Sequence, residues 1–118
     1  MTEPPSEAHA AAQITTDLTP AELAPLLRRE GLGAHFSQST WKGAWVWLEG
    51  TGDFDCSLQP TQPGEYLLRD GFGERRALET LARNLSSALV RLGIRHRMEL
   101  YDENQHMFDY LHYDWPPD

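Results

Sequence analysis

Apolar and polar positions alternate in two runs near the C-terminus of the chain. The first run covers residues 94–101 and the second covers residues 107–115, with a polar stretch between them. A period of two is typical of a half-buried β-strand, because successive side chains point to opposite faces of a sheet. The two runs therefore predict a β-hairpin.

The register of this hairpin follows from the residues that face each other across it. A two-residue loop at Asn104–Gln105 places Met98 opposite Leu111, which is an apolar pair. A four-residue loop over residues 103–106 is an equal alternative, since Asn-Gln is a poorer tight turn than Asn-Gly. Both loops leave the same residues on each face of the hairpin.

Helical spacing of apolar residues marks two other segments. Residues 74–92 carry leucine and alanine three and four positions apart and are followed by Gly93, which predicts a long amphipathic helix. Residues 19–22 read Thr-Pro-Ala-Glu, a capping box with proline at the first helical position. We expect a helix to begin there, and Pro25 predicts that it is short or kinked.

Three further strands are predicted between the two helices. Residues 39–49 are apolar on both faces, which is typical of a central strand. Residues 54–59 alternate between apolar and polar positions, and residues 65–69 form a short third run. Glycine-rich and proline-rich turns at residues 50–53 and 60–64 separate these strands, which predicts an antiparallel meander.

The order of helix, three strands, helix and two strands predicts an α+β fold in two layers. We expect one mostly antiparallel sheet of five strands with both helices on one face. A single domain over residues 17–118 suits a chain of 118 residues. Residues 1–16 lack an apolar period to bury, so we expect them to form a disordered tail.

Strand parity divides the side chains between the two faces of the predicted sheet. The face toward the helices is expected to hold Ala44, Val46, Leu48, Phe54, Cys56, Leu58, Tyr66, Leu68, Ile94, Met98, Leu100, Leu111 and Trp115. The opposite face is expected to hold Trp41, Trp45, Trp47, Asp55, Ser57, Arg95, Arg97, Tyr101, Phe108, Tyr110 and His112.

The second set contains more aromatic area than a small monomer normally leaves in water. Tryptophan, tyrosine and arginine are also the residue types that anchor protein interfaces. We therefore predict a binding surface made of Trp41, Trp45, Trp47, Arg97, Tyr101, Tyr110 and His112. The alternative is that the sheet curls, or that the N-terminal helix or tail covers this face, so that the tryptophans belong to the core.

Charge and composition narrow the classes of partner and compartment. The formal net charge of −8 repels a phosphate backbone and favours a basic protein partner, so no nucleic acid is expected. Cys56 is the only cysteine, which excludes an internal disulfide and agrees with a cytoplasmic location. No apolar run approaches the ~18 residues of a membrane span, so no membrane partner is expected.

One arrangement of residues could support catalysis. His96, Asp109 and Cys56 share the helix-facing parity, and a Cys-His-Asp set is a known nucleophilic arrangement. The objection is access, because the helix over residues 74–92 covers that face. No histidine or cysteine pair has the spacing of a metal motif, and the sequence indicates no cofactor.

These observations favour a small acidic protein-binding module over an enzyme. An adaptor or an inhibitor of the immunity-protein kind fits the acidic charge, because acidity speeds the capture of a basic partner. Homodimerisation is a second use of the same aromatic face. The alternative function is a small ligand-binding domain or enzyme with a pocket near His96 and Asp109.

Overall fold

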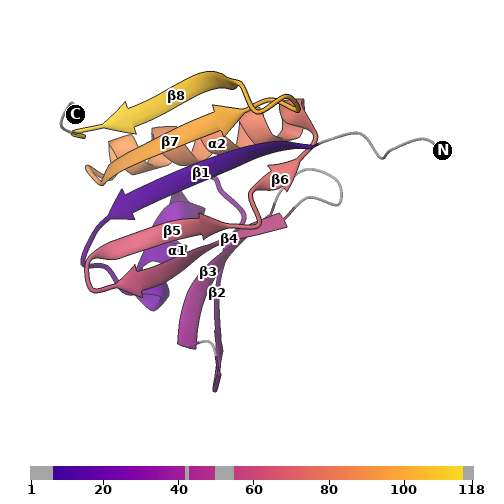
Figure 1. Ribbon diagram of the computed structural model, residues 1–118. Helices are drawn as coiled ribbons and strands as arrows, with labels where there is room; N and C mark the ends of the chain where they lie inside the picture. Colours follow the sequence, from indigo (N-terminus) through magenta and orange to yellow (C-terminus); the bar gives the residue numbers. More distant parts are fainter. Residues whose placement is uncertain (1–6, 42, 50–54, 116–118) are drawn as a thin grey trace.

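The protein is an α+β domain with one antiparallel sheet and two helices on one side of it (Figure 1). The computed structural model describes residues 7–41, 43–49 and 55–115. The elements are β1 (Ala8–Thr15), α1 (Pro20–Arg29), β2 (Ala34–Ser39), β3 (Gly43–Glu49), β4 (Asp55–Gln62), β5 (Glu65–Arg69), β6 (Phe72–Gly73), α2 (Arg75–Arg91), β7 (Arg95–Tyr101) and β8 (Met107–Tyr113).

The sheet has eight strands within the described part of the chain, rather than the five that were predicted. Its order is β2-β3-β4-β5-β1-β7-β8, and the short strand β6 pairs with β1 beside this path. All the strand pairs are antiparallel. Figure 1 shows α2 behind the β1, β7 and β8 half of the sheet and α1 behind the other half.

The largest correction concerns the N-terminal segment. The expected tail over residues 1–16 is wrong for Ala8–Thr15, which forms β1 in the centre of the sheet between β5 and β7. Alternate side chains of this strand, ending with Ile14 at 0% exposure, are buried in the core. Alanine has a low preference for strands. This strand is stabilised by pairing with β5 on one edge and β7 on the other, rather than by intrinsic preference. Residues 1–6 lie outside the described residues.

The predicted strand over residues 39–49 is divided in the structure. Only Gly43–Glu49 forms β3, and the preceding residues turn back into β2, an edge strand that the sequence did not predict. The expected turn at residues 50–53 and Phe54 lie outside the described residues. The third predicted strand over residues 65–69 is confirmed as β5.

Both predicted helices are confirmed, and each has a capping side chain at its N-terminus. At α1, the Thr19 hydroxyl accepts a hydrogen bond from the Glu22 amide, and the Glu22 carboxylate accepts one from the Thr19 amide. The helix is ten residues long and contains Pro25. At α2, the Glu74 carboxylate accepts hydrogen bonds from two backbone amides of the first turn.

One core joins the helices to the sheet. Leucines of α1 and α2 pack on alternate residues of β1, β3, β4 and β7 in a single buried cluster. The predicted register of the C-terminal hairpin is confirmed, since Met98 pairs with Leu111. The loop of this hairpin runs over residues 102–106, and a bulge shifts the register between Leu100 and Tyr101.

A glycine allows β6 to lie against β1. A Cβ atom at Gly71 would come within 2.8 Å of the carbonyl oxygen of Ala10, and the Ala10 amide donates a 2.7 Å hydrogen bond to the carbonyl of Gly71. Any larger residue would force the two backbones apart. Gly71 therefore sets the position of Phe72, the first residue of β6.

Candidate binding face

The face of the sheet opposite the helices, here called the open face, is covered by neither helix and by no other segment of the described chain (Figure 1). Trp45 and Trp47 alternate with Val46 and Leu48, which are fully buried toward the helices. The two tryptophans therefore lie on the open face, where both are half-buried. The N-terminal segment that could have covered them is a strand within the sheet instead.

Trp41 does not lie with the other two tryptophans. It is 94% exposed in the turn between β2 and β3, and not on the face of a strand. Its predicted place on the open face is therefore wrong. The reason is that the chain reverses at this point, so that strand parity does not extend from residue 45 back to residue 41.

The tryptophans and the tyrosines of the predicted surface are far apart. Trp45 lies on β3, whereas Tyr101 and Arg97 lie on β7, and three strands separate β3 from β7. Four strand spacings of about 4.8 Å give a separation of roughly 19 Å across the sheet. The predicted binding residues thus form two groups on one face rather than one compact site.

Two arginines and a tryptophan form one corner of the open face. The guanidinium carbons of Arg95 and Arg97 lie 5.0 Å and 5.1 Å from the centre of the Trp115 ring. Cation–π contacts of this kind hold arginine in place without neutralising it. The Nε donor of Arg95 is buried and has no hydrogen-bond partner among the described residues.

This corner corrects the predicted position of Trp115, which was expected to face the helices. Asp114 has a positive φ of 54°, so the chain turns sharply just before the tryptophan. The strand parity that places Leu111 toward the core does not continue through such a turn. The Trp115 ring therefore reaches the arginines of the open face.

Aromatic pairs extend from this corner along β7 and β8. The rings of Tyr110 and His112 stack with centres 4.9 Å apart, and His112 is the cross-strand partner of Arg97. The hydroxyl of Tyr101 donates a 2.5 Å hydrogen bond to Glu99, and this bond raises the pKa of the tyrosine. The structure thus brings Arg97, Tyr101, Tyr110 and His112 onto one continuous surface.

At the opposite end of these strands, Tyr101 lies with three residues that the sequence did not single out, Phe72, His9 and Met107. Phe72 pairs with His9, His9 pairs with Tyr101, and Tyr101 pairs with Met107. Register partners in an antiparallel sheet share a face, so these four residues form one line across β6, β1, β7 and β8, here called the apolar row. Phe72 fell between the predicted elements and His9 in the expected tail, so only the tertiary pairing reveals the row.

Phe108 was also predicted on the open face, and this is wrong. It lies at the bulge in the β7–β8 pairing, and its ring is 4.2 Å from the guanidinium carbon of Arg75 at the start of α2. A bulge inserts one extra residue and reverses the parity of the strand beyond it. Phe108 therefore packs on the helix side.

The catalytic candidate His96 is fully buried beneath α2. Its Nδ1 lies 2.9 Å from the carbonyl oxygen of Ile94, which can only accept, so Nδ1 carries the proton. Its Nε2 lies 2.8 Å from the hydroxyl of Ser86 and accepts a hydrogen bond from it. Burial lowers the pKa of His96 below the ordinary value of 6.5, so the ring is held neutral.

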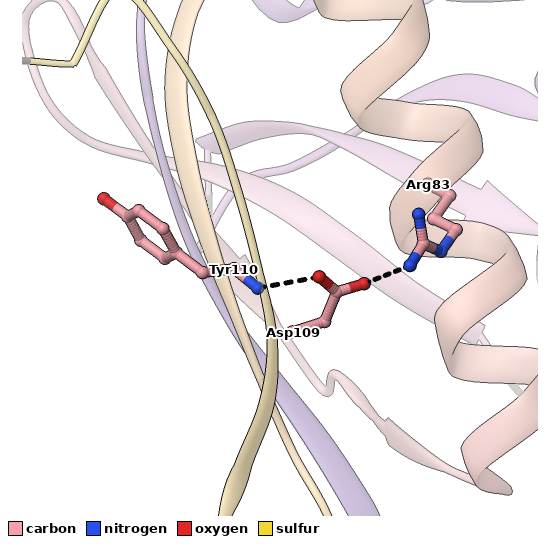
Figure 2. Close-up of polar contacts among 3 residues, drawn as sticks. All are labelled: Arg83, Asp109 and Tyr110. Carbon is pink, nitrogen blue, oxygen red and sulfur yellow. Dashed lines mark hydrogen bonds and ion pairs between the residues drawn. The ribbon is translucent and has the colours of Figure 1, made fainter.

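Asp109 also lies on the helix side, and it forms an ion pair with Arg83 of α2 at 2.5 Å. Figure 2 shows its carboxylate directed at Arg83 and the ring of Tyr110 on the other side of the strand. A carboxylate oxygen of Asp109 also accepts a hydrogen bond from the Tyr110 amide. This ion pair fastens the edge strand β8 to α2.

Cys56 is not brought together with His96 and Asp109. It is buried on β4, three strand spacings from β7 in the order of the sheet, or about 14 Å. A thiol must lie within hydrogen-bonding distance of the base that activates it. The three residues therefore share a face, as their parity predicts, but not a site.

Two cavities lie elsewhere in the molecule. One of 410 Å³ is lined by residues 16–20 and 60–66, between the start of α1 and the β4–β5 hairpin. A smaller hollow of 120 Å³ opens on the open face, where Ala11 is surrounded by Gln13, Leu67, Arg97 and Glu99. Neither lining contains His96 or Asp109.

The described residues contain no group of three or more histidine, cysteine or carboxylate side chains placed to hold a metal ion. No helix in this part of the chain is long and apolar enough to cross a membrane. Comparison with known proteins finds no matching family model, no similar curated protein and no similar solved structure.

Proposed function

We propose that the protein is a small cytoplasmic binding module that captures a protein partner on its open face, as an adaptor or as an inhibitor of the immunity-protein kind. The observation that carries this proposal is the combination of arginine and aromatic side chains on a sheet face that no helix covers. These residue types supply most of the binding energy in protein interfaces. The net charge of −8 favours a basic partner.

The geometry adds a second reason. This part of the open face lies on two interior strands, β1 and β7, and on the edge strand β8. The other side of these three strands packs on α2. A face supported in this way changes shape little on binding, and such preorganisation lowers the entropy lost in association. The hollow over Ala11 offers a place for a partner side chain.

The alternative function, a ligand-binding domain or enzyme with a pocket near His96 and Asp109, has less support. His96 has 0% exposure, and both of its ring nitrogens are engaged by neighbouring groups. Asp109 is paired with Arg83. A substrate would have to displace α2 to reach His96, whereas Asp109 is partly exposed but already held in its ion pair with Arg83.

The proposal is tested by affinity capture from the native cell with quantitative mass spectrometry. The baits are the full chain, the Tyr110→Ala and Trp45→Ala variants, and the Val90→Ala variant as a control. Val90 is 43% exposed on α2, so the Val90→Ala substitution removes exposed apolar area from the opposite side of the molecule. We expect Tyr110→Ala to weaken capture of a specific partner by about tenfold or more.

Each bait is first checked for folding by circular dichroism and thermal unfolding. Loss of capture by a folded Tyr110→Ala variant, together with normal capture by Val90→Ala, supports the open face as the binding surface. Equal capture by all four baits would reject it.

A further inference from the structure

The apolar row is a line of side chains of which Phe72 and Met107 are exposed and His9 and Tyr101 are partly exposed. The ring centres of His9 and Phe72 are 5.9 Å apart, and those of His9 and Tyr101 are 4.8 Å apart and stacked. Phe72 and Met107 at the two ends of the row are 57% and 54% exposed. The next residue of β7 toward the core side, Leu100, is fully buried, so the core is complete without the row.

Contiguous exposed apolar side chains with a polar rim are typical of interaction sites. The row lies on four adjacent strands, two of which are held in the interior of the sheet. It is therefore a rigid platform and not a mobile loop tip. Its middle is formed by two stacked rings, which present flat apolar area at a low cost in side-chain entropy.

Most of the charges around the row are negative, and the positive charge near it comes from Arg75, which stacks on Phe108 beside Met107, and from Arg97 on β7, which acts on Tyr101. No lysine or arginine lies within two positions of any of its four members, all in described segments of the chain. The carboxylates within two sequence positions of a member of the row are those of Glu7, Asp70, Glu74, Glu99, Asp102, Glu103 and Asp109. Two of them are engaged within the fold, because Glu74 caps α2 and Asp109 pairs with Arg83.

The remaining carboxylates lie within two positions of a member of the row. Backbone amides of the β7–β8 loop donate to Asp102 and lower its pKa. Glu99 accepts the hydrogen bond of Tyr101, a member of the row. Glu7 and Glu103 are exposed. An apolar platform surrounded by negative charge selects a ligand that is apolar and cationic at once.

We propose that the apolar row and its carboxylate rim are the docking site for a segment of a partner protein that places large apolar side chains beside lysine or arginine. The inference rests on the proposed function and assigns the chemistry of the partner and its place on the open face. The partner's apolar side chains lie on the His9 and Tyr101 rings, and its cationic groups reach Glu7, Glu99 and Glu103.

Charge complementarity favours this occupant over two others. A second copy of the chain that met row against row would bring two carboxylate rims together, which is unfavourable. A nucleic acid would place phosphates against the same rim. A basic segment is attracted by the rim and also by the net charge of the whole chain.

The test uses the full chain and three labelled peptides measured by fluorescence anisotropy. The probe peptide alternates lysine and phenylalanine. One control peptide has glutamate in place of lysine, and the other has serine in place of phenylalanine. We expect saturable binding of the probe with a Kd at least about tenfold lower than for either control peptide.

Matched variants locate the binding. The double variant Phe72→Ala with Met107→Ala removes the ends of the row and should raise the Kd of the probe about tenfold. The double variant Glu7→Gln with Glu103→Gln leaves the row intact and should raise it about threefold. Val90→Ala and Glu79→Gln on α2 remove an apolar group and a charge elsewhere, and both should bind the probe as the unaltered chain does.

Three results would overturn the inference: no saturable binding of the probe, equal affinity for the glutamate peptide, or equal binding by the row variant. A dimer detected by sedimentation that dissociates in the row variant would also overturn it, by assigning the row to a second copy. If Tyr110→Ala abolishes capture of the native partner and the row variant does not, the proposed function stands and this inference fails. If neither variant affects capture, both fail.

Discussion

Single residues of this protein derive their properties from the side of the sheet on which they lie. His96 and His112 come from adjacent strands, yet His96 is buried under α2 and His112 is exposed beside Arg97. The sequence predicts this separation, because alternation assigns the two histidines to opposite faces. It does not predict Ser86 as the partner of His96, since that contact joins a helix to a strand.

The burial of His96 makes stability depend on pH. Its pKa is lowered in the folded chain, so the unfolded chain takes up a proton at a higher pH than the folded one. The contribution of His96 is fully present above about pH 6.5 and is lost as the pH falls below that value, because the unfolded state then binds more protons. We expect the free energy of unfolding, measured by urea denaturation, to fall between about pH 7 and pH 5.

Two variants isolate this effect. The fall between pH 7 and pH 5 should be smaller in His96→Gln and unchanged in His106→Gln, since His106 is exposed in the β7–β8 loop. If the free energy of unfolding falls equally between pH 7 and pH 5 in the unaltered chain and in both variants, the assignment of the fall to His96 is wrong. The carboxylates whose pKa is lowered in the folded chain lose their contribution in a separate, more acidic range; they are Glu22, Glu65, Glu74 and Asp102.

Among the elements, the helices and the C-terminal hairpin could be predicted, and β1 and β2 could not. The Thr19–Glu22 box and the apolar spacing of residues 74–92 are local patterns that each specify a helix. The Met98–Leu111 pair specifies the hairpin register. By contrast, β1 is rich in alanine, which has a low preference for strands, and becomes a strand only because β5 and β7 enclose it.

The candidate site follows the same division. The arginines and tyrosines of β7 and β8 could be placed by alternation, because these strands are regular. Trp41, Phe108 and Trp115 were misplaced, since each lies at a turn, a bulge or a positive φ angle that interrupts the alternation. The apolar row required the pairing of four strands, which no local pattern contains.

The central position of β1 leads to a prediction about truncation. A chain that begins at Thr16 lacks the strand that joins β5 to β7, so both of these lose their ladder hydrogen bonds on one side. Unpaired buried backbone groups are costly, at about 1–3 kcal/mol each. We expect this chain to lose cooperative thermal unfolding, as followed by circular dichroism.

Complementation provides the control for that truncation. A synthetic peptide of residues 7–15 should restore cooperative unfolding by adding the missing strand, whereas the same peptide with Ile14→Asp should not, because Ile14 is fully buried. Cooperative unfolding of the truncated chain alone, at the temperature of the full chain, would show that β1 is dispensable.

At the scale of the whole molecule, the open face is electrically polarised. Arg95 lies at one end of β7, and Tyr101 with the carboxylates of the β7–β8 loop lies at the other end, about 20 Å away along the strand. A partner with the opposite arrangement of charges is attracted in one orientation and repelled in the other. The face can thus fix the direction in which a bound segment runs.

This polarity predicts how salt affects association. The Debye length falls from about 30 Å at 0.01 M salt to about 3 Å at 1 M, so long-range attraction of a cationic ligand is screened. We expect the association rate of the lysine–phenylalanine peptide, measured by stopped-flow fluorescence, to fall by about tenfold or more over this range. The dissociation rate should change much less, and an association rate that is independent of salt would exclude electrostatic steering.

The position of β1 also determines when the fold can be completed. This strand is synthesised before its neighbour β7, and both helices lie between the two strands in the sequence. Until β7 emerges from the ribosome, one edge of β1 has no ladder partner, and exposed strand edges of this kind are templates for association with other chains. The alanine-rich composition of β1 lowers the tendency of this unpaired strand to aggregate, because a strand of valine and isoleucine would pair far more readily with another chain.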